Sequence, residues 1–232
     1  MSLATLPFTG NERFPLDTQL ASGATPEMEA ASLSQVANMM GGAVPLVASR
    51  FYGLPRGATP GTLLTVLGTM YAYPFYVPGP TTISTIGIYT TTGQTGGAGR
   101  VGIYADNGSG YPGNLVSGGV SGALIATSGA ASQTTTISLT LQAGWYWLAS
   151  IYTASTTQPT VASAAVGYGA TTNAMLGSDT AAHLIATSAQ AASGISVTGQ
   201  TYGALTGINS GVFPSGATLT LNADTPLVIL GT

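Results

Sequence analysis

Few residues of this chain belong to the types that perform catalysis, and His183 is its only histidine. A Ser-His-Asp site needs a histidine that a carboxylate holds within reach of a serine nucleophile. Asp179 precedes His183 by four residues, a spacing that would place the two side by side on a helix. No Gly-x-Ser-x-Gly nucleophile motif accompanies the pair. We therefore expect His183 to lie in a loop or to pack, without a catalytic role.

Carboxylates are scarce from residue 61 onward, where the chain has no glutamate and three aspartates: Asp106, Asp179 and Asp224. Glycoside hydrolysis needs two carboxyl groups at a fixed separation. The segments 106–109 (DNGS) and 222–224 (NAD) are turn sequences, which explain their aspartates without catalysis. The first segment also offers too few oxygen ligands for a calcium loop. The sequence thus predicts no enzymatic activity, no metal site and no cofactor.

Carbohydrate contact is harder to dismiss, because exposed aromatic rings stack on sugar rings while amides and hydroxyls bind the sugar hydroxyl groups. Four tyrosines lie in or beside turn sequences and are candidate glycan contacts: Tyr104, Tyr111, Tyr168 and Tyr202. The competing interpretation is that each ring packs or is merely exposed. Tyr104, for example, ends a strand, and Tyr111 could serve only to brace its turn.

The chain is 232 residues long, and only 5% of them are charged, with four arginines and no lysine. Disordered segments combine low hydrophobicity with high net charge, whereas this chain is 44% hydrophobic with a net charge of −3. The composition therefore favours a sheet protein with Ser/Thr faces. Such a surface repels neighbouring copies weakly and favours burial in an assembly. The alternative is a surface kept soluble by hydroxyl groups alone.

Several classes of function are disfavoured by the composition. Cysteine is absent, so there is no disulfide or thiolate metal site. Four arginines without lysine argue against a nucleic-acid partner. The first residues, MSLATLPFTGNERF, lack a basic region followed by an apolar core, so we expect no secretory signal. Apolar runs such as 226–230 are too short for membrane insertion.

Three zones are expected along the chain: an arm and helix at 1–42, a connector at 43–60 and a β domain at 61–232. Residues 1 to about 24 have no periodicity and should form an irregular arm. A helix is predicted over 26–40, with Thr25 as N-cap. It would present an apolar stripe that includes Met28, Leu33, Val36 and Met40. The stripe would pack on the chain's own β domain or form an inter-subunit helix bundle.

Short apolar segments separated by Gly, Pro, Asn and Asp turns predict antiparallel strands. We expect strands at 63–67, 70–77, 83–89, 100–105, 123–127, 137–141, 145–152, 184–186, 195–197, 217–221 and 227–230. The segment 153–183 is expected to form long loops or small-residue strands. Trp145 and Trp147 should share one face and lie in the core. The fold class predicted is all-β: an antiparallel jelly-roll β-sandwich with an N-terminal extended arm and one short helix.

The order of motifs in the β domain resembles jelly-roll domains of tailed-phage virion proteins. The motifs are two Gly-Ile-Tyr tripeptides at 87–89 and 102–104, Asp-Asn-Gly at 106–108, Pro-Gly-x-Leu at 112–115 and Leu-x-x-Gly-x-Tyr-Trp-Leu at 141–148. The resemblance spans about residues 60 to 232 and implies a fibre or decoration protein on the virion surface. Such fibres usually cover their sheet edges by forming homotrimers, which is the oligomer we expect.

The arm resembles the opening segment of many phage fibre and head-appendage proteins, in which three short motifs precede a helix. They are Thr-Gly-x-Glu at 9–12, Pro-x-Asp-Thr at 15–18 and Gly-x-x-Pro at 23–26. The resemblance implies an anchor that binds a capsid or tail protein. The anchoring residues it implies are Thr9, Gly10, Glu12, Pro15, Asp17 and Thr18.

The preferred hypothesis is a non-enzymatic virion protein whose N-terminus is anchored to the head or tail. Its β domain would decorate the particle or attach to host-surface glycans. The alternatives are a carbohydrate-binding module, which the charged arm and missing signal disfavour, and a small glycan hydrolase, which the carboxylate count disfavours.

Overall fold

The computed structural model describes residues 13–16, 29–32, 46–54, 58–166, 176, 193–214, 219–222 and 224–232. The chain divides into two compact units, Met1–Pro45 and Leu46–Thr232. The second unit therefore begins inside the expected connector, and most of the segment 43–60 belongs to it. Within the described part of the chain, no helix is long and apolar enough to span a membrane.

The first unit contains an antiparallel strand pair, β1 (Arg13–Leu16) and β2 (Glu29–Ser32). The prediction of a helix is wrong over Glu29–Ser32, and that of an arm without regular structure is wrong over Arg13–Leu16. A helix of fifteen residues is marginal without a partner, whereas here the main chains of the two segments bond to each other. Met28, Leu33, Val36 and Met40 lie outside the described residues, as do Thr9, Gly10, Glu12, Asp17 and Thr18.

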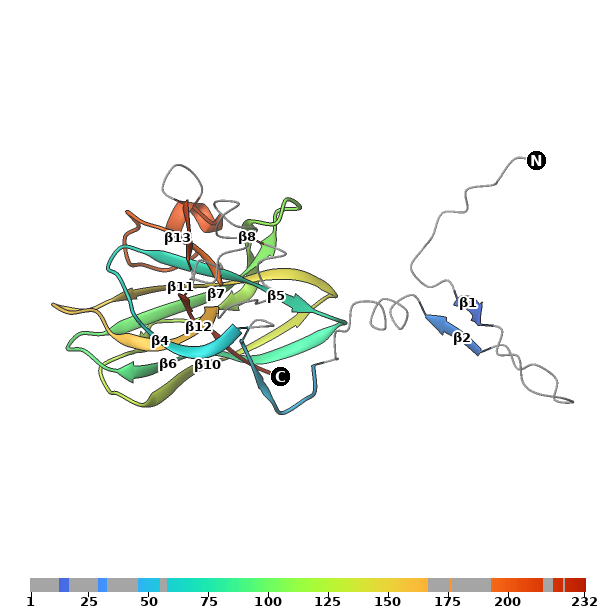
Figure 1. Cartoon of the computed structure of the whole chain (residues 1–232), viewed down its shortest axis with the longest axis horizontal. Helices are drawn as coiled ribbons and strands as arrows, with labels where there is room; N and C mark the ends of the chain where they lie inside the picture. Colours follow the sequence, from blue (N-terminus) through green and yellow to red (C-terminus); the bar gives the residue numbers. More distant parts are fainter. Residues whose placement is uncertain are drawn as a thin grey trace, which may run out of the picture. The chain divides into compact units, whose positions relative to one another are not determined.

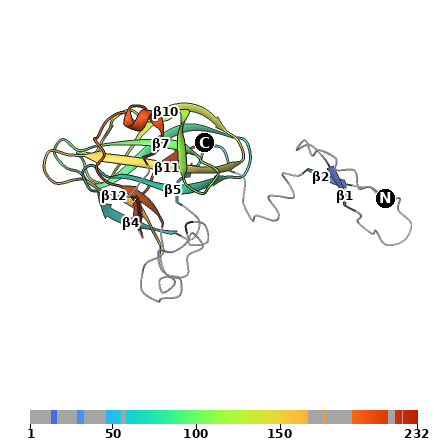
Figure 2. The same cartoon turned by 90° about the horizontal axis from the view of Figure 1, so that it is seen from above.

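The second unit is a sandwich of two seven-stranded sheets in which every strand pair is antiparallel (Figure 1). Sheet I contains β3 (Phe51–Tyr52), β4 (Ala58–Leu64), β6 (Thr81–Thr92), β10 (Ala131–Leu141), β12 (Thr160–Val166), β15 (Asp224–Pro226) and β16 (Ile229–Gly231). Sheet II contains β5 (Met70–Val77), β7 (Ala98–Asp106), β8 (Pro112–Val120), β9 (Leu124–Ile125), β11 (Gly144–Thr153), β13 (Gly194–Val197) and β14 (Leu219–Asn222). Figure 2 shows the same sandwich from above. The all-β sandwich is confirmed, and the jelly-roll connectivity stays a prediction.

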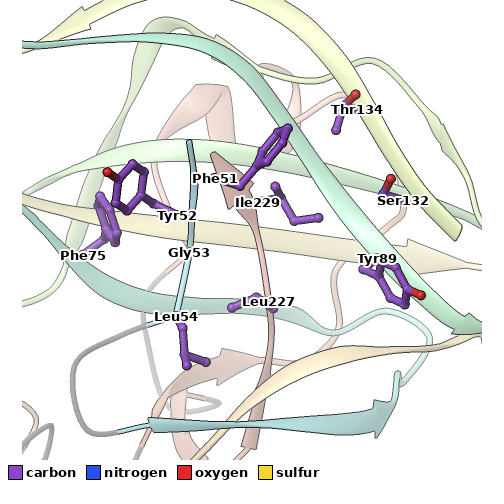
Figure 3. A pocket seen from close by; sticks show the side chains of 10 residues that line it. All are labelled: Phe51, Tyr52, Gly53, Leu54, Phe75, Tyr89, Ser132, Thr134, Leu227 and Ile229. Carbon is purple, nitrogen blue, oxygen red and sulfur yellow. The ribbon is translucent and has the colours of Figure 1, made fainter. Parts of the chain in front are cut away.

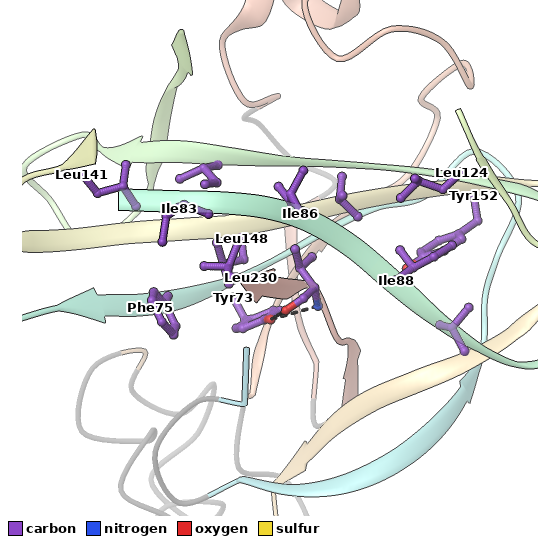
Figure 4. Packing of buried hydrophobic residues seen from close by; sticks show 14 of the residues in the cluster. Tyr73, Phe75, Ile83, Ile86, Ile88, Leu124, Leu141, Leu148, Tyr152 and Leu230 are labelled. Atoms are coloured by element: carbon purple, nitrogen blue, oxygen red, sulfur yellow. Dashed lines mark hydrogen bonds between the residues drawn. The ribbon is translucent and has the colours of Figure 1, made fainter. Parts of the chain in front are cut away.

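The main core lies between the inner faces of the sheets (Figure 4). Ile83, Ile86 and Ile88 of β6 contribute from sheet I, and Tyr73 of β5 and Leu148 of β11 contribute from sheet II. All five are fully buried. Their spacing follows the two-residue period of a strand, with an irregularity in the β6–β10 register that shifts the pattern by one residue.

Sheet II has a second core on its outer face. The segment 198–214, which contains the short turn of 3-10 helix η1 (Ile208–Gly211), covers this face (Figure 1). Trp147 of β11 packs there with Leu205 and Phe213 of the covering segment. Strand β11 is therefore apolar on both faces, and this explains the nearly continuous hydrophobic run in its sequence.

The strand pattern differs from prediction mainly where small residues dominate. Strand β8 was not expected, because its sequence PGNLVSGGV contains three glycines and a proline. Its pairing with β7 has two register shifts, which accommodate these residues. The segment 153–183 is expected to form long loops or small-residue strands, and β12 (TVASAAV) is such a strand. The strand expected at 184–186 lies outside the described residues.

Candidate functional site

The four candidate tyrosines have different environments. Tyr104 is fully buried, with its ring edge-on to Phe213 at 5.5 Å between centroids. Its proposed glycan contact is therefore wrong, because the covering segment excludes it from solvent. Tyr202 is half-buried, with the Arg100 guanidinium carbon 5.6 Å from its ring centroid, so it mainly packs. Tyr168 lies outside the described residues. Tyr111 is 43% exposed and stays a candidate.

The turn that carries Tyr111 is held by its own side chains. The Asp106 Oδ1 atom accepts hydrogen bonds from the N–H of Gly108 at 2.7 Å and of Gly110 at 3.4 Å. The Asn107 Oδ1 atom accepts one from the N–H of Ser109 at 2.8 Å. These are Asx-type bonds, in which a short side chain replaces a main-chain partner. The prediction that Asp106 serves a turn is confirmed.

Asp106 also ties this turn to the sheet. Its Oδ2 atom accepts a hydrogen bond from the indole N–H of Trp147 at 2.9 Å. The ring of Tyr111 lies parallel to that indole, with an interplanar angle of 4° and 6.5 Å between centroids. The Tyr111 ring is thus supported from below by a buried aromatic side chain, and the Asp106 carboxylate is occupied by three donors.

Trp145 lies two residues before Trp147, on the same outer face of β11. It is 47% exposed, so its prediction as a core residue is wrong, whereas that of the fully buried Trp147 is confirmed. Its ring packs against Tyr76, which faces it across the β5–β11 pair, at 5.0 Å between centroids and an angle of 54°. Sequence reasoning missed Tyr76, because only the register between these strands brings the two rings together.

We call Tyr76, Tyr111, Trp145 and Trp147 the aromatic strip. Trp145 lies two residues from the buried Trp147, about 7 Å along the strand, and Tyr111 stacks on Trp147. Both Trp145 and Tyr111 are exposed, and exposed aromatic rings suit stacking on sugar rings. The Asn107 amide nitrogen and the Ser109 hydroxyl lie in the adjoining turn and supply groups that can hydrogen-bond to a sugar.

The other titratable groups offer little chemistry within the described residues. No group of three His, Cys, Asp or Glu side chains is gathered there as a metal site would require. Asp224, at the start of β15, has a raised pKa because burial disfavours its charged form. His183 and Asp179 lie outside the described residues.

Comparison with known proteins gives no matching family model and no curated protein of significant similarity. The function therefore has to be argued from the residues themselves.

Proposed function

We propose that this chain is a non-enzymatic structural protein of a tailed-phage particle, anchored by its N-terminal unit, whose sandwich attaches to host-surface glycans. The observation that carries the attachment role is the aromatic strip. In this strip Trp145 and Tyr111 are exposed to solvent, and each packs against a second aromatic ring.

Rigidity is what makes the strip suitable for weak ligands. The Asp106 bonds hold the turn of Tyr111 in place, and strand pairing fixes Trp145 beside Tyr76. A site that is ordered before binding loses less conformational entropy when the sugar docks. Single contacts of this kind are weak, and several copies on one particle would sum them into useful avidity.

Two further features support an anchored role. The chain forms a small N-terminal unit and a larger sandwich, as expected of an anchor and a projecting domain. The start of the sandwich is clamped to residue Thr232: the Ser49 N–H donates to the Thr232 carbonyl at 2.9 Å, and the Thr232 N–H donates to the Arg50 carbonyl at 3.1 Å. A tension applied through the N-terminal segment would therefore be borne by strand pairing. The identity of the particle rests on the resemblance of residues 9–26 and 87–148 to phage fibre proteins.

Glycan attachment is tested by electrophoresis of the full chain through native gels that contain bacterial lipopolysaccharide or capsular polysaccharide. We expect retardation of the native chain and about fivefold or more weaker retardation after Trp145→Ala or Tyr111→Ala, because about 1–3 kcal/mol is lost per stacked ring. Ile125→Ala is the matched control, since Ile125 is 60% exposed on β9, away from the strip. Equal retardation of all variants would refute the site. Release of reducing ends from the polysaccharide would refute the non-enzymatic assignment.

The anchoring role is tested by mass spectrometry of gradient-purified particles from a lysate that expresses the chain. Peptides of this protein should co-sediment with the particles, and a chain that starts at Leu46 should not bind them. A chain that is found only in the soluble fraction would contradict the proposal.

A further inference from the structure

The outer face of sheet I contains an apolar groove of about 640 Å³ that the proposed function does not use. It is lined by residues from four segments of the sheet I side, together with Phe75 from sheet II (Figure 3). The residues of the four segments are Phe51–Leu54, Tyr89, Ser132 with Thr134, and Leu227 with Ile229. In this view Phe51 and Ile229 lie between the Tyr52–Phe75 pair and Tyr89. We call it the β3 groove.

The β3 groove is unusually apolar for an open surface. Phe51 is 71% exposed, Leu54 40% and Tyr89 37%. Among the described residues that line the groove none is charged, and their side-chain polar groups are hydroxyls, those of Ser132, Thr134 and the two tyrosines. A sugar site needs several donors and acceptors, so this lining favours apolar protein side chains as the occupant.

The exposed area is large enough to form the centre of a protein interface. At roughly 200 Å² for a fully exposed aromatic side chain, Phe51 and Tyr89 together expose about 210 Å². Leu54 and the neighbouring Val47, which is 51% exposed, extend this patch. Apolar patches of a few hundred Å² commonly mark interaction sites.

The groove continues into an open strand edge. Strand β10, which carries Ser132 and Thr134, pairs only with β6 among the described strands. Its eleven residues, ASQTTTISLTL, include no charged residue and no proline. Charged residues and proline are among the devices that protect exposed edges, and β10 has neither, so its edge is open to pairing with another chain.

We propose that the β3 groove and the adjoining β10 edge form the contact between copies of this chain, with Phe51 of one copy seated in the groove of the next. The choice of a second copy as occupant follows from position and charge. Phe51 and Leu54 lie in the first residues of the sandwich, so copies whose N-terminal units are anchored together approach each other on this side. That step rests on the proposed anchored role. With five per cent charged residues, little electrostatic repulsion opposes the contact between identical surfaces.

Sedimentation velocity of the full chain tests the contact. We expect the native chain to sediment as an oligomer and Phe51→Ser to shift towards the 23.0 kDa monomer, with a dissociation constant at least tenfold higher. Trp145→Ala is the control, because it removes an exposed aromatic side chain from the opposite sheet and should leave the mass unchanged. A monomeric native chain, or an unchanged mass for Phe51→Ser, would overturn the proposal.

Cross-linking gives a second readout that does not depend on removing Phe51. The chain has no cysteine, so a single introduced thiol reacts alone. Leu54→Cys treated with a short bismaleimide should give covalent dimers, and Ile125→Cys on β9 should give none. Absence of dimers from Leu54→Cys would count against the groove as the contact. A native chain that forms oligomers but shows no glycan retardation would refute the proposed attachment site and leave this interface standing.

Discussion

Tyr73→Phe removes one oxygen atom from the core and should destabilise the sandwich substantially. The fully buried Tyr73 hydroxyl donates to the carbonyl of Val228 at 3.1 Å and accepts from the N–H of the same residue at 3.0 Å (Figure 4). Val228 lies between β15 and β16, so its main-chain groups bond to this hydroxyl instead of a neighbouring strand. Burial raises the pKa of Tyr73, which keeps the hydroxyl protonated and able to donate.

The expected loss follows from leaving both main-chain groups of Val228 buried and unpaired. Each unsatisfied buried group costs about 1–3 kcal/mol, so we expect Tyr73→Phe to lower the free energy of unfolding by about 2–4 kcal/mol. For a chain of this size, that corresponds to a fall in Tm of roughly 4–16 °C.

Tyr152→Phe is the matched control. Tyr152 is fully buried in the same core, and its hydroxyl has no hydrogen-bond partner within the described residues. Its removal should leave the free energy of unfolding unchanged or raise it by up to about 1 kcal/mol. Urea unfolding at one fixed protein concentration, followed by tryptophan fluorescence, reports on the sandwich alone because Trp145 and Trp147 both lie in it. An equal loss in both variants would refute the role of the Val228 bonds.

Three further predictions concern single side chains. Asp106→Ala should lower the free energy of unfolding by about 1.5–3 kcal/mol, measured by urea unfolding, because the buried Trp147 indole N–H loses its acceptor; a change near zero would contradict the tie. The raised pKa of Asp224 means that the folded state binds its proton more tightly than the unfolded state, so stability should fall as pH rises from about 4 through that raised pKa. Thermal unfolding across pH 3.5–7 should show a smaller fall for Asp224→Asn, and identical profiles would exclude Asp224 as the cause. The Thr232 hydroxyl donates to the Val47 carbonyl at 2.7 Å, so Thr232→Val should raise amide exchange over residues 46–52, and unchanged exchange would contradict the clamp.

The strands could be predicted from the sequence wherever apolar residues alternate, because the two-residue period dictates which side chains share a face. Ile137, Leu139 and Leu141 of β10 follow this period and all pack on the main core. The helix expected over Glu29–Ser32, where the structure has strand β2, was the main error of local reasoning. A good N-cap and an apolar stripe do not decide the outcome when a strand partner, here β1, is supplied by a segment more than ten residues away.

The candidate site was only partly predictable. The turn at 106–109 has a local signature, and its side chains form the expected bonds. The pairing of Tyr76 with Trp145 depends on the register between β5 and β11, which no local pattern specifies. The β3 groove depends on segments that lie far apart in sequence, so no single motif reports it.

The two Gly-Ile-Tyr tripeptides show which features the sequence determines and which the tertiary structure decides. The sequence by itself determined that Ile88 and Tyr89, like Ile103 and Tyr104, point to opposite faces of their strand, because side chains alternate along it. Only the tertiary structure decided that Tyr89 borders an open groove and that Tyr104 is fully buried. The segment 198–214 packs on the outer face of sheet II over Tyr104, whereas Tyr89 on the outer face of sheet I borders the β3 groove. The contact that buries Tyr104 is with Phe213, about a hundred residues later in the chain, so no local pattern predicts it.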